Sequence, residues 1–275
     1  MATGMPSFWR DEALPFLELR SVAHGQGVCY TRHAHETFSI GAITQGSTRY
    51  LNGRVSQLVG PGTVVLMNPG DMHACNPSDA QAWSYSMFHV DAAWLAGIQD
   101  ELGYSIDGRF RPFAETATTA LFGGLQALHA VLVDEGAGQL EKHGAAIGFF
   151  SGMLASLAPG QLPAPAADPR LARAAEFIND NFSCELSLAE ISAAAELSPA
   201  HFIRSFKRRF GMTPHAYLVN RRIQVGRAQL RRGLPIAEVA SNAGFADQAH
   251  FQRAFKRHVA ATPGQYRRAL APAGR

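Results

Sequence analysis

The sequence predicts a two-domain α+β protein, in which a β-rich N-terminal half is followed by an all-helical C-terminal half. Three observations lead to this prediction. Residues 27–90 alternate short apolar runs with Gly, Pro and Asn, which is typical of many short strands in a barrel or jelly roll. Residues 113–157 follow a helical period instead. Residues 188–266 contain one helical motif twice, which indicates a supersecondary unit used twice.

Length and charge support this division. A chain of 275 residues suggests about two domains of roughly 100–200 residues each. Residues 1–167 hold 8 Lys and Arg against 14 Asp and Glu, a net charge of −6, whereas residues 168–275 hold 17 against 8, a net charge of +9. Such asymmetry indicates a nucleic-acid-binding half. Four prolines and a glycine predict an extended linker at 159–169, between domains at 1–158 and 170–275.

The strands of the N-terminal half are predicted from apolar runs between turns. Asn52-Gly53 is a strong hairpin signal. The clearest runs are Phe38–Ile43, Tyr50–Leu51, Gly62–Met67 and Trp83–Val90.

Two apolar stripes predict a helical hairpin after the strands, with its turn at Gly136-Ala-Gly138. The hairpin could pack wholly on its own barrel or also form a dimer contact. The stripes are Leu121, Leu125, Leu128 and Leu132, and then Ile147, Phe150, Leu154 and Leu157.

The C-terminal half carries start and stop signals for helices. Asp168-Pro169 predicts a helix to about Phe182, and Ser187 with Glu190 predicts a capping box on a helix through Ala195. Ser198-Pro199 begins the next helix, which Gly211 ends. We expect a long helix over 214–231, a turn at Gly244 and a further helix over about 247–258.

The repeated motif places basic and polar residues on one helix of each unit. It runs first as Leu188-Ala-Glu-Ile191, His201-Phe-Ile-Arg-Ser-Phe-Lys-Arg208 and Thr213-Pro-His-Ala-Tyr217, and then as Ile236-Ala-Glu-Val239, His250-Phe-Gln-Arg-Ala-Phe-Lys-Arg257 and Thr262-Pro-Gly-Gln-Tyr266. Two phenylalanines four residues apart face inward in each second helix. We expect these helices to enter the DNA major groove, where Arg and Gln bond bases and Lys neutralises phosphates. His201 and His250 could contact bases, contact phosphates or pack in the core. The candidate DNA-binding residues are Ala200, His201, Ile203, Arg204 and Lys207 in the first unit, and Asp247, Gln248, Ala249, His250, Gln252, Arg253 and Lys256 in the second.

Residues 168–270 resemble the paired helix-turn-helix domain of AraC-type transcription regulators. The resemblance implies base contacts from Ala200, Ile203 and Arg204, and from Gln248, Ala249, His250 and Arg253. Ala260 departs from the family, which usually has glycine there, as the first unit has at Gly211; alanine costs little unless that residue needs a positive φ. The residues that carry the resemblance are Ile236-Ala-Glu-Val-Ala240, Gly244-Phe245, His250-Phe251, Arg253-Ala-Phe-Lys-Arg257, Thr262-Pro263 and Tyr266-Arg267.

Two N-terminal segments resemble the motifs of cupin-like barrels, namely Gly27-x5-His33-Ala-His35 with Gly46, and Gly62 with Pro69-Gly70-Asp71-Met-His73. In metal cupins the three histidines would converge with a carboxylate on one ion. The expected glutamate is absent here, because Ser39 and Ile40 occupy its positions. His89 could replace it in a metal site, an organic effector could bind instead, or the histidines could be structural. We favour an organic effector, with no metal and no cofactor, and the candidate effector-binding residues are His33, His35, Arg49, His73, Tyr85 and His89.

These features predict a sequence-specific DNA-binding transcription regulator that responds to a small-molecule effector. The resemblance suggests an amino acid or similar metabolite as effector, a homodimer, and RNA polymerase as a further candidate partner. Three scattered cysteines without CxxC spacing, no signal-peptide pattern and no apolar run of about 18 residues lead us to expect a cytoplasmic protein without membrane contact. No catalytic triad, carboxylate pair or phosphate-binding loop stands out, so we expect no enzyme. The alternatives are a metal-dependent cupin enzyme fused to a DNA-binding domain, and a constitutive architectural DNA binder.

Overall fold

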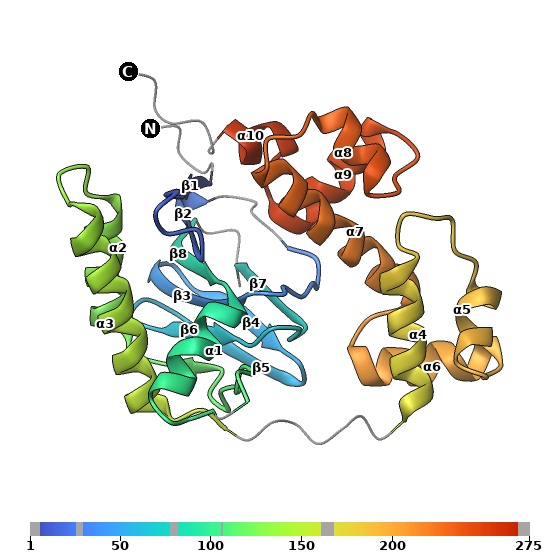
Figure 1. Ribbon diagram of the computed structural model, residues 1–275, viewed down its shortest axis with the longest axis horizontal. Helices are drawn as coiled ribbons and strands as arrows, with labels where there is room; N and C mark the ends of the chain where they lie inside the picture. Colours follow the sequence, from blue (N-terminus) through green and yellow to red (C-terminus); the bar gives the residue numbers. More distant parts are fainter. Residues whose placement is uncertain (1–5, 26–29, 78–81, 106, 161–167, 269–275) are drawn as a thin grey trace. The chain divides into compact units, whose positions relative to one another are not determined.

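The computed structural model describes residues 6–25, 30–77, 82–105, 107–160 and 168–268 (Figure 1). The chain divides into two compact units. The β-rich unit extends to residue 162, and the helical unit comprises residues 163–275 together with the short segment Tyr30–His33. Most of the linker expected at 159–169 lies outside the described residues, as do Gly27 and Cys29.

The β-rich unit, for which the sequence predicts a barrel or jelly roll, contains two antiparallel sheets. The strand order is β1-β2-β8-β3-β6-β9 in the larger sheet and β5-β4-β7 in the smaller one. Among the described residues no strand pairs across the two sheets, so the barrel is not closed by hydrogen bonds. The strands are β1 (Ser7–Trp9), β2 (Leu17–Gly25), β3 (Phe38–Gln45), β4 (Thr48–Asn52), β5 (Val55–Val59), β6 (Val64–Met67), β7 (His73–Pro77), β8 (Trp83–Val90) and β9 (Ala117–Thr118).

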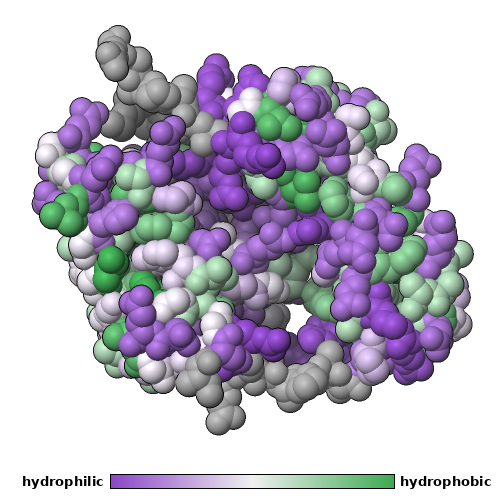
Figure 2. All heavy atoms as spheres, in the orientation of Figure 1, coloured by the Kyte–Doolittle hydropathy of each residue, from purple (hydrophilic) through white to green (hydrophobic). Residues whose placement is uncertain are grey.

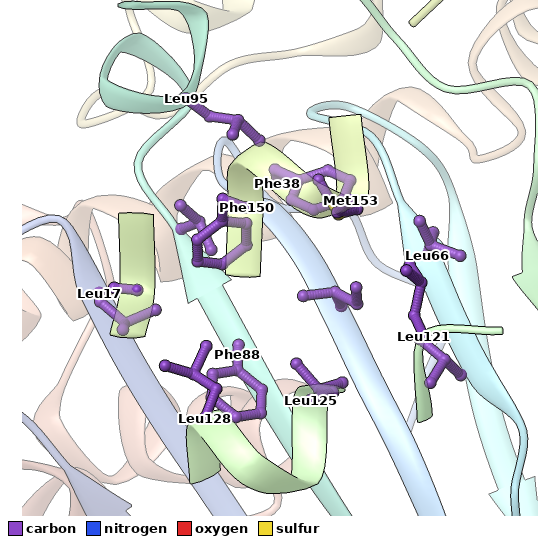
Figure 3. Close-up of a cluster of buried hydrophobic side chains, with 14 of the residues drawn as sticks. Leu17, Phe38, Leu66, Phe88, Leu95, Leu121, Leu125, Leu128, Phe150 and Met153 are labelled. Atoms are coloured by element: carbon purple, nitrogen blue, oxygen red, sulfur yellow. The ribbon is translucent and has the colours of Figure 1, made fainter. Parts of the chain in front are cut away.

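One face of the larger sheet forms the apolar core of this unit. Leu17, Phe38 and Phe88 project from β2, β3 and β8 onto helices that cover the sheet (Figure 3). These helices are α1 (Ala92–Glu101), α2 (Phe122–Val133) and α3 (Gln139–Leu157), and α2 and α3 lie side by side (Figure 1). Helix α1 has no counterpart among the predicted helices and begins where the Asp91 side chain accepts the Trp94 N–H.

The predicted helical hairpin is confirmed, with one shift in its second stripe. Leu125, Leu128 and Leu132 are buried on α2 as expected. On α3 the buried residues near Phe150 are Ala146 and Met153, and Ile147 remains 49% exposed. Ile147 was predicted to lie in the apolar stripe of this helix. It lies about 100° around the helix from the buried Ala146, so its side chain is outside the buried face.

The opposite face of the larger sheet is polar and also buried. Successive side chains of a strand point to opposite faces of the sheet. Residues that alternate with the core residues, as Glu18 does between Leu17 and Leu19, therefore lie on this second face. Pairing places Glu18 beside His89 and His89 beside Ser39, and all three are buried. This polar inner face positions the histidines described below.

The helices of the helical unit begin and end close to the predicted residues. Asp168 caps the first helix, Ser187 and Glu190 form the expected capping box, and Gly211 ends α6 with φ 72°. Ser198 precedes α6 but makes no capping side-chain hydrogen bond. The helices are α4 (Pro169–Asp180), α5 (Leu188–Ala194), α6 (Pro199–Phe210), α7 (Pro214–Arg231), α8 (Ile236–Asn242), α9 (Gln248–Val259) and α10 (Pro263–Arg268).

The two repeats differ by one residue in the turn between their paired helices. The offset is 48 positions from α5 to α8, and 49 positions from α6 to α9. With the first offset Glu196 corresponds to Gly244, and both have a positive φ, of 53° and 76°. Both turns therefore adopt the left-handed conformation at the same point. The turn of the second repeat then has one more residue before its second helix, α9.

Gly244 also lies at the junction of the two repeats. A Cβ on Gly244 would come within 2.7 Å of the Ser183 carbonyl oxygen, which belongs to the chain after α4. Arg222 on α7 donates to the carbonyl oxygens of Phe182 and Cys184, at 2.7 and 2.8 Å. Both contacts are made to backbone atoms of the segment that follows α4. Gly244 in the second repeat and Arg222 on α7 are therefore held close to the end of α4.

The C-terminal ends of α6 and α9 give a matched stability prediction. Ala260 has φ 49° where Gly211 has φ 72°, so the position does need the left-handed conformation that costs an alanine about 1–2 kcal/mol. We expect Ala260→Gly to stabilise the helical unit by about 0.5–1 kcal/mol, because the freer unfolded chain offsets part of the gain. Gly211→Ala should destabilise it by a similar amount. Urea unfolding followed by far-UV circular dichroism measures both, and destabilisation by Ala260→Gly would contradict the assignment.

Candidate nucleic-acid interface and histidine cluster

Helix α6 separates an apolar face from a basic one. Phe202 and Phe206 are fully buried and pack on each other, with ring centroids 5.2 Å apart. Arg204 and Lys207 are exposed on the other side, and His201 is exposed as well. Of the candidates on α6, Ala200 is also exposed and Ile203 is half-buried. The candidate residues therefore form one surface of this helix.

Helix α9 repeats the arrangement with a different set of polar groups. Phe251 and Phe255 are fully buried, and Gln248, Gln252, Arg253 and Lys256 are exposed, as is Ala249. Amide and guanidinium groups on one exposed face can bond base edges, while the lysine can contact phosphate. Hydrophilic residues cover much of the visible surface over α4–α6 (Figure 2). Helices α6 and α9 both end in a basic turn.

Two of the candidate DNA-binding residues have structural roles in the folded unit. The Asp247 carboxylate accepts the His250 N–H at 2.6 Å and caps α9. Its negative charge would also repel a phosphate, so we assign Asp247 to capping. The His250 ring packs edge-on against Phe245 with centroids 5.2 Å apart. His201 corresponds to His250 in the repeat and is exposed, so the two histidines are not equivalent.

Three of the candidate effector-binding histidines converge in the structure. His33, His35 and His73 each offer a ring nitrogen, and these atoms all lie within 4.8 Å of one another. The ring of His35 is 4.9 Å from that of His73 and 4.8 Å from that of His89, measured between centroids. Four of the six candidates therefore lie close together.

Backbone and side-chain hydrogen bonds orient these rings. Nδ1 of His33 lies 2.7 Å from the Thr31 carbonyl oxygen, and Nδ1 of His73 lies 2.8 Å from the Asp71 carbonyl oxygen. A carbonyl only accepts, so Nδ1 of each ring carries a proton. Nδ1 of His89 is 2.9 Å from the Ser39 hydroxyl.

The turn before β7 fixes the position of His73. The Gly70 N–H donates to the His35 carbonyl oxygen at 2.8 Å, which ties the two histidine-bearing segments together. The Asp71 carboxylate accepts from the Asn68 backbone and side chain, and the Asn52 amide is 3.4 Å away. Burial lowers the pKa of His73 from its usual value, although the Asp71 carbonyl and charge act in the opposite direction, so this ring is neutral at pH 7.

The other two candidate effector residues lie elsewhere. Arg49 is exposed, whereas its neighbours Thr48 and Tyr50 on β4 are buried, so its side chain does not share their face. Tyr85 is buried and stacks on Trp83 with centroids 4.3 Å apart. It is four residues from His89 along β8, about 13 Å at the rise of an extended strand.

Two residues beside the cluster were missed by sequence reasoning. Glu18 pairs in register with His89 and forms an ion pair with Arg10 at 2.7 Å, and Ser39 contacts His89 directly. The alternation Leu17-Glu18-Leu19-Arg20 carries the signal, because a period of two sends its charged residues to the face opposite the core.

Comparisons with known proteins agree with this division into two units. The family of AraC-like ligand-binding domains matches residues 16–148, and a helix-turn-helix domain family matches residues 191–269. An uncharacterised HTH-type transcriptional regulator of Bacillus subtilis, YbfI, is 27% identical over 226 residues, 80% of each chain. The HTH-type transcriptional activator RhaS of Klebsiella pneumoniae is 25% identical over 226 residues, 79% of this chain and 80% of that one. The structure of ToxT from Vibrio cholerae superposes with a TM-score of 0.56 at 13% identity, covering 89% of this chain and 94% of that one, which shows a shared fold.

Proposed function

This chain belongs to the family of AraC-type transcription regulators, and from that premise we propose which of its residues bind DNA and which sense the effector. As a member it binds DNA through its helix-turn-helix half and has a domain for a small-molecule ligand. The relatives named above are transcription regulators, in line with a role other than catalysis. No described helix is long and apolar enough to cross a membrane. We propose that the protein acts in the cytoplasm, with DNA as a partner and RNA polymerase as a further candidate partner.

We propose that α6 and α9 read bases through Arg204 and Arg253, with Gln248 and Gln252 as further base contacts. The observation that carries this proposal is the exposure of these side chains on the face opposite each buried phenylalanine pair. Lys207 and Lys256 lie on the same exposed faces and are assigned to phosphates.

Alanine substitution of the two arginines tests this assignment. Arg204→Ala and Arg253→Ala should each weaken specific binding by about 1–3 kcal/mol and relax preference at one base position, because a bidentate contact to a base edge is lost. The measurement is fluorescence anisotropy on duplexes that the wild-type protein selects from a random pool, compared with unselected duplexes.

Two control variants frame this measurement. Lys207→Ala should weaken binding to both kinds of duplex equally and reduce the salt slope by about one. Arg54→Ala removes an exposed arginine of the β-rich unit and should change neither. An arginine variant that behaved like Lys207→Ala would show a phosphate contact in place of base readout.

We propose that the effector binds at the histidine cluster, defined as His33, His35, His73 and His89. The convergence of their rings supports this placement, and the exposure of Arg49 argues against a carboxylate clamp there. A homodimer through the α2–α3 hairpin is the family-based expectation. Leu140 is 88% exposed and Ile147 is 49% exposed on α3, which supports a further apolar contact on that helix.

A further inference from the structure

We propose that α6 and α9 recognise different base pairs beside a guanine contact that they share, and that Ile203 and Gln252 make the difference. Ile203 selects a thymine through contact with its methyl group, and Gln252 selects an adenine through two hydrogen bonds. The inference rests on the proposed base contacts of Arg204 and Arg253, for which guanine is the matching base. It names the class of DNA sequence that this pair of helices fits.

The aromatic core holds α6 and α9 in the same rotational position, each within its own repeat. Both helices bury a pair of phenylalanines four residues apart. The second ring of each pair also contacts a tyrosine, with centroids 5.5 Å apart for Phe206 and Tyr217 and likewise 5.5 Å apart for Phe255 and Tyr266. Because the same contacts fix both helices, residues 49 positions apart point in the same direction relative to the core of their repeat.

The face of each helix opposite this core differs at one position. It consists of the second, fifth, sixth and ninth residues of the helix, which share one side because they recur at intervals of three and four. Three of these four positions hold the same residue type in both helices, namely alanine, arginine and lysine. The fifth position holds Ile203 in α6 and Gln252 in α9. A difference in base preference between the two faces therefore arises first at this position.

The side chain of Ile203 suits a thymine. It has no group that can donate or accept a hydrogen bond, and thymine is the base that offers a methyl group in the major groove. A β-branched side chain has one strongly preferred rotamer in a helix, so the methyl groups of Ile203 keep a defined position. Ile203 is half-buried next to the fully buried Phe202 and directly precedes the exposed Arg204. The thymine contact therefore lies beside the guanine contact of Arg204.

The amide of Gln252 suits an adenine. Its oxygen accepts from the N6 amino group while its NH₂ donates to N7, and Gln252 is exposed beside Arg253. Gln248 adds a second exposed amide at the start of α9, where α6 begins with Pro199. The sequence of α6 contains no amide side chain. The means of recognising adenine is therefore confined to α9.

The duplex that fits both helices accordingly contains two guanines, one next to a thymine and the other next to an adenine. A base contact of this kind discriminates by about 5- to 150-fold against the wrong base. The two elements are therefore not interchangeable, and a duplex in which the element read by α6 also replaces the element read by α9 should bind more weakly.

The test introduces the residue of each helix into the other in the full-length protein. Ile203→Gln should shift the preferred base beside the Arg204 guanine from thymine to adenine, by at least about 5-fold in the ratio of the two affinities. Gln252→Ile should produce the opposite shift beside the Arg253 guanine. Competition fluorescence anisotropy with the selected duplex and all of its single base-pair substitutions measures both shifts. The alanine variant of each arginine locates its guanine by the preference that is lost.

Control variants separate base contact from indirect effects. Ile203→Val keeps a β-branched apolar side chain and should keep the thymine preference. Ala193→Gln places the same amide at an exposed position of α5 and should change no base preference. Far-UV circular dichroism reports whether each variant keeps the helical unit folded, and tryptophan fluorescence reports the β-rich unit, which holds all three tryptophans. Gln252→Ile, at an exposed position, gives a second readout should the half-buried Ile203 prove necessary for folding.

The two arginine variants separate this inference from the proposed function. Suppose that Arg204→Ala and Arg253→Ala each relax one base position, while the variants at Ile203 and Gln252 leave every preference unchanged or shift it to other bases. The arginines would then contact bases as proposed, and the thymine and adenine assignments would be wrong. The same shift produced by Ala193→Gln would also contradict the inference. Arginine variants that weakened binding to selected and unselected duplexes equally would instead refute the proposed base contacts themselves.

Discussion

Gly244→Ala is expected to destabilise the helical unit by about 2–5 kcal/mol and to abolish specific DNA binding. Gly244 has φ 76°, and its Cβ would lie 2.7 Å from the Ser183 carbonyl oxygen and 2.8 Å from the Ser183 Cα. The left-handed conformation costs an alanine about 1–2 kcal/mol, and overpacking against atoms that cannot rotate away adds about 1–3 kcal/mol. Relief of the clash would move the second repeat away from α4, which changes the placement of α9 relative to α6.

Gly233 provides the matched control for this prediction. Gly233 has φ 83° in the turn after α7, and no atom lies within 4 Å of its added Cβ. Gly233→Ala therefore carries the conformational strain without the clash and should cost only about 1–2 kcal/mol. Urea unfolding by circular dichroism reports the helical unit, while tryptophan fluorescence reports the β-rich unit and should not move. Equal effects of the two substitutions would show that the Ser183 contact contributes nothing.

Phe255→Ala should destabilise the helical unit by about 3–5 kcal/mol, among the largest effects that we expect from a single side chain. Phe255 is fully buried, and its ring centroid lies 5.4 Å from that of Phe251 and 5.5 Å from that of Tyr266. Removal of the ring leaves a cavity between α9 and α10 that surrounding helices fill only in part. Since domains are stable by about 5–15 kcal/mol, a loss of this size removes a large part of the stability of the helical unit that holds α9.

Two further variants distinguish packing from charge in this prediction. Lys256→Ala removes the exposed neighbour and should change stability by less than about 0.5 kcal/mol while weakening DNA binding. Phe206→Ala removes the corresponding ring of the first repeat and should destabilise by a similar amount to Phe255→Ala. A loss below about 1 kcal/mol for Phe255→Ala would contradict the core assignment of this phenylalanine.

Local signals made the helical half predictable. Caps act within one turn, so Asp168, Ser187 and Gly211 marked helix ends to within a residue or two. The repeat supplied the rest, because the same pattern had to fold the same way twice. The family expected from these motifs is confirmed. The sequence could show only that Ala260 would be strained if its φ were positive. The sign of that φ depends on how the following turn packs.

The β-rich half was less predictable because its contacts are distant in sequence. The alternation of short strands gave the class of fold, yet the two separate sheets depend on pairings such as β2 with β8. The resemblance to cupin motifs implied that His33, His35 and His73 converge, and their ring nitrogens lie within 4.8 Å of one another. Nothing in the sequence near Arg49 shows which face of β4 this residue occupies. The sequence also did not show that the Asp247 carboxylate caps α9 in place of contacting DNA.

The number of residues in the long helix α7 sets the rotation of the second repeat relative to the first. Its 18 residues span about 27 Å at 1.5 Å per residue, a length comparable to the roughly 34 Å of one turn of DNA. One residue inserted into α7 would advance the second repeat by only about 1.5 Å but rotate it by about 100°. Seven residues would return it to within about 20° of its original orientation, two turns further along. A change in the length of α7 therefore keeps the orientation of the second repeat only when it adds or removes residues in steps close to whole turns of the helix.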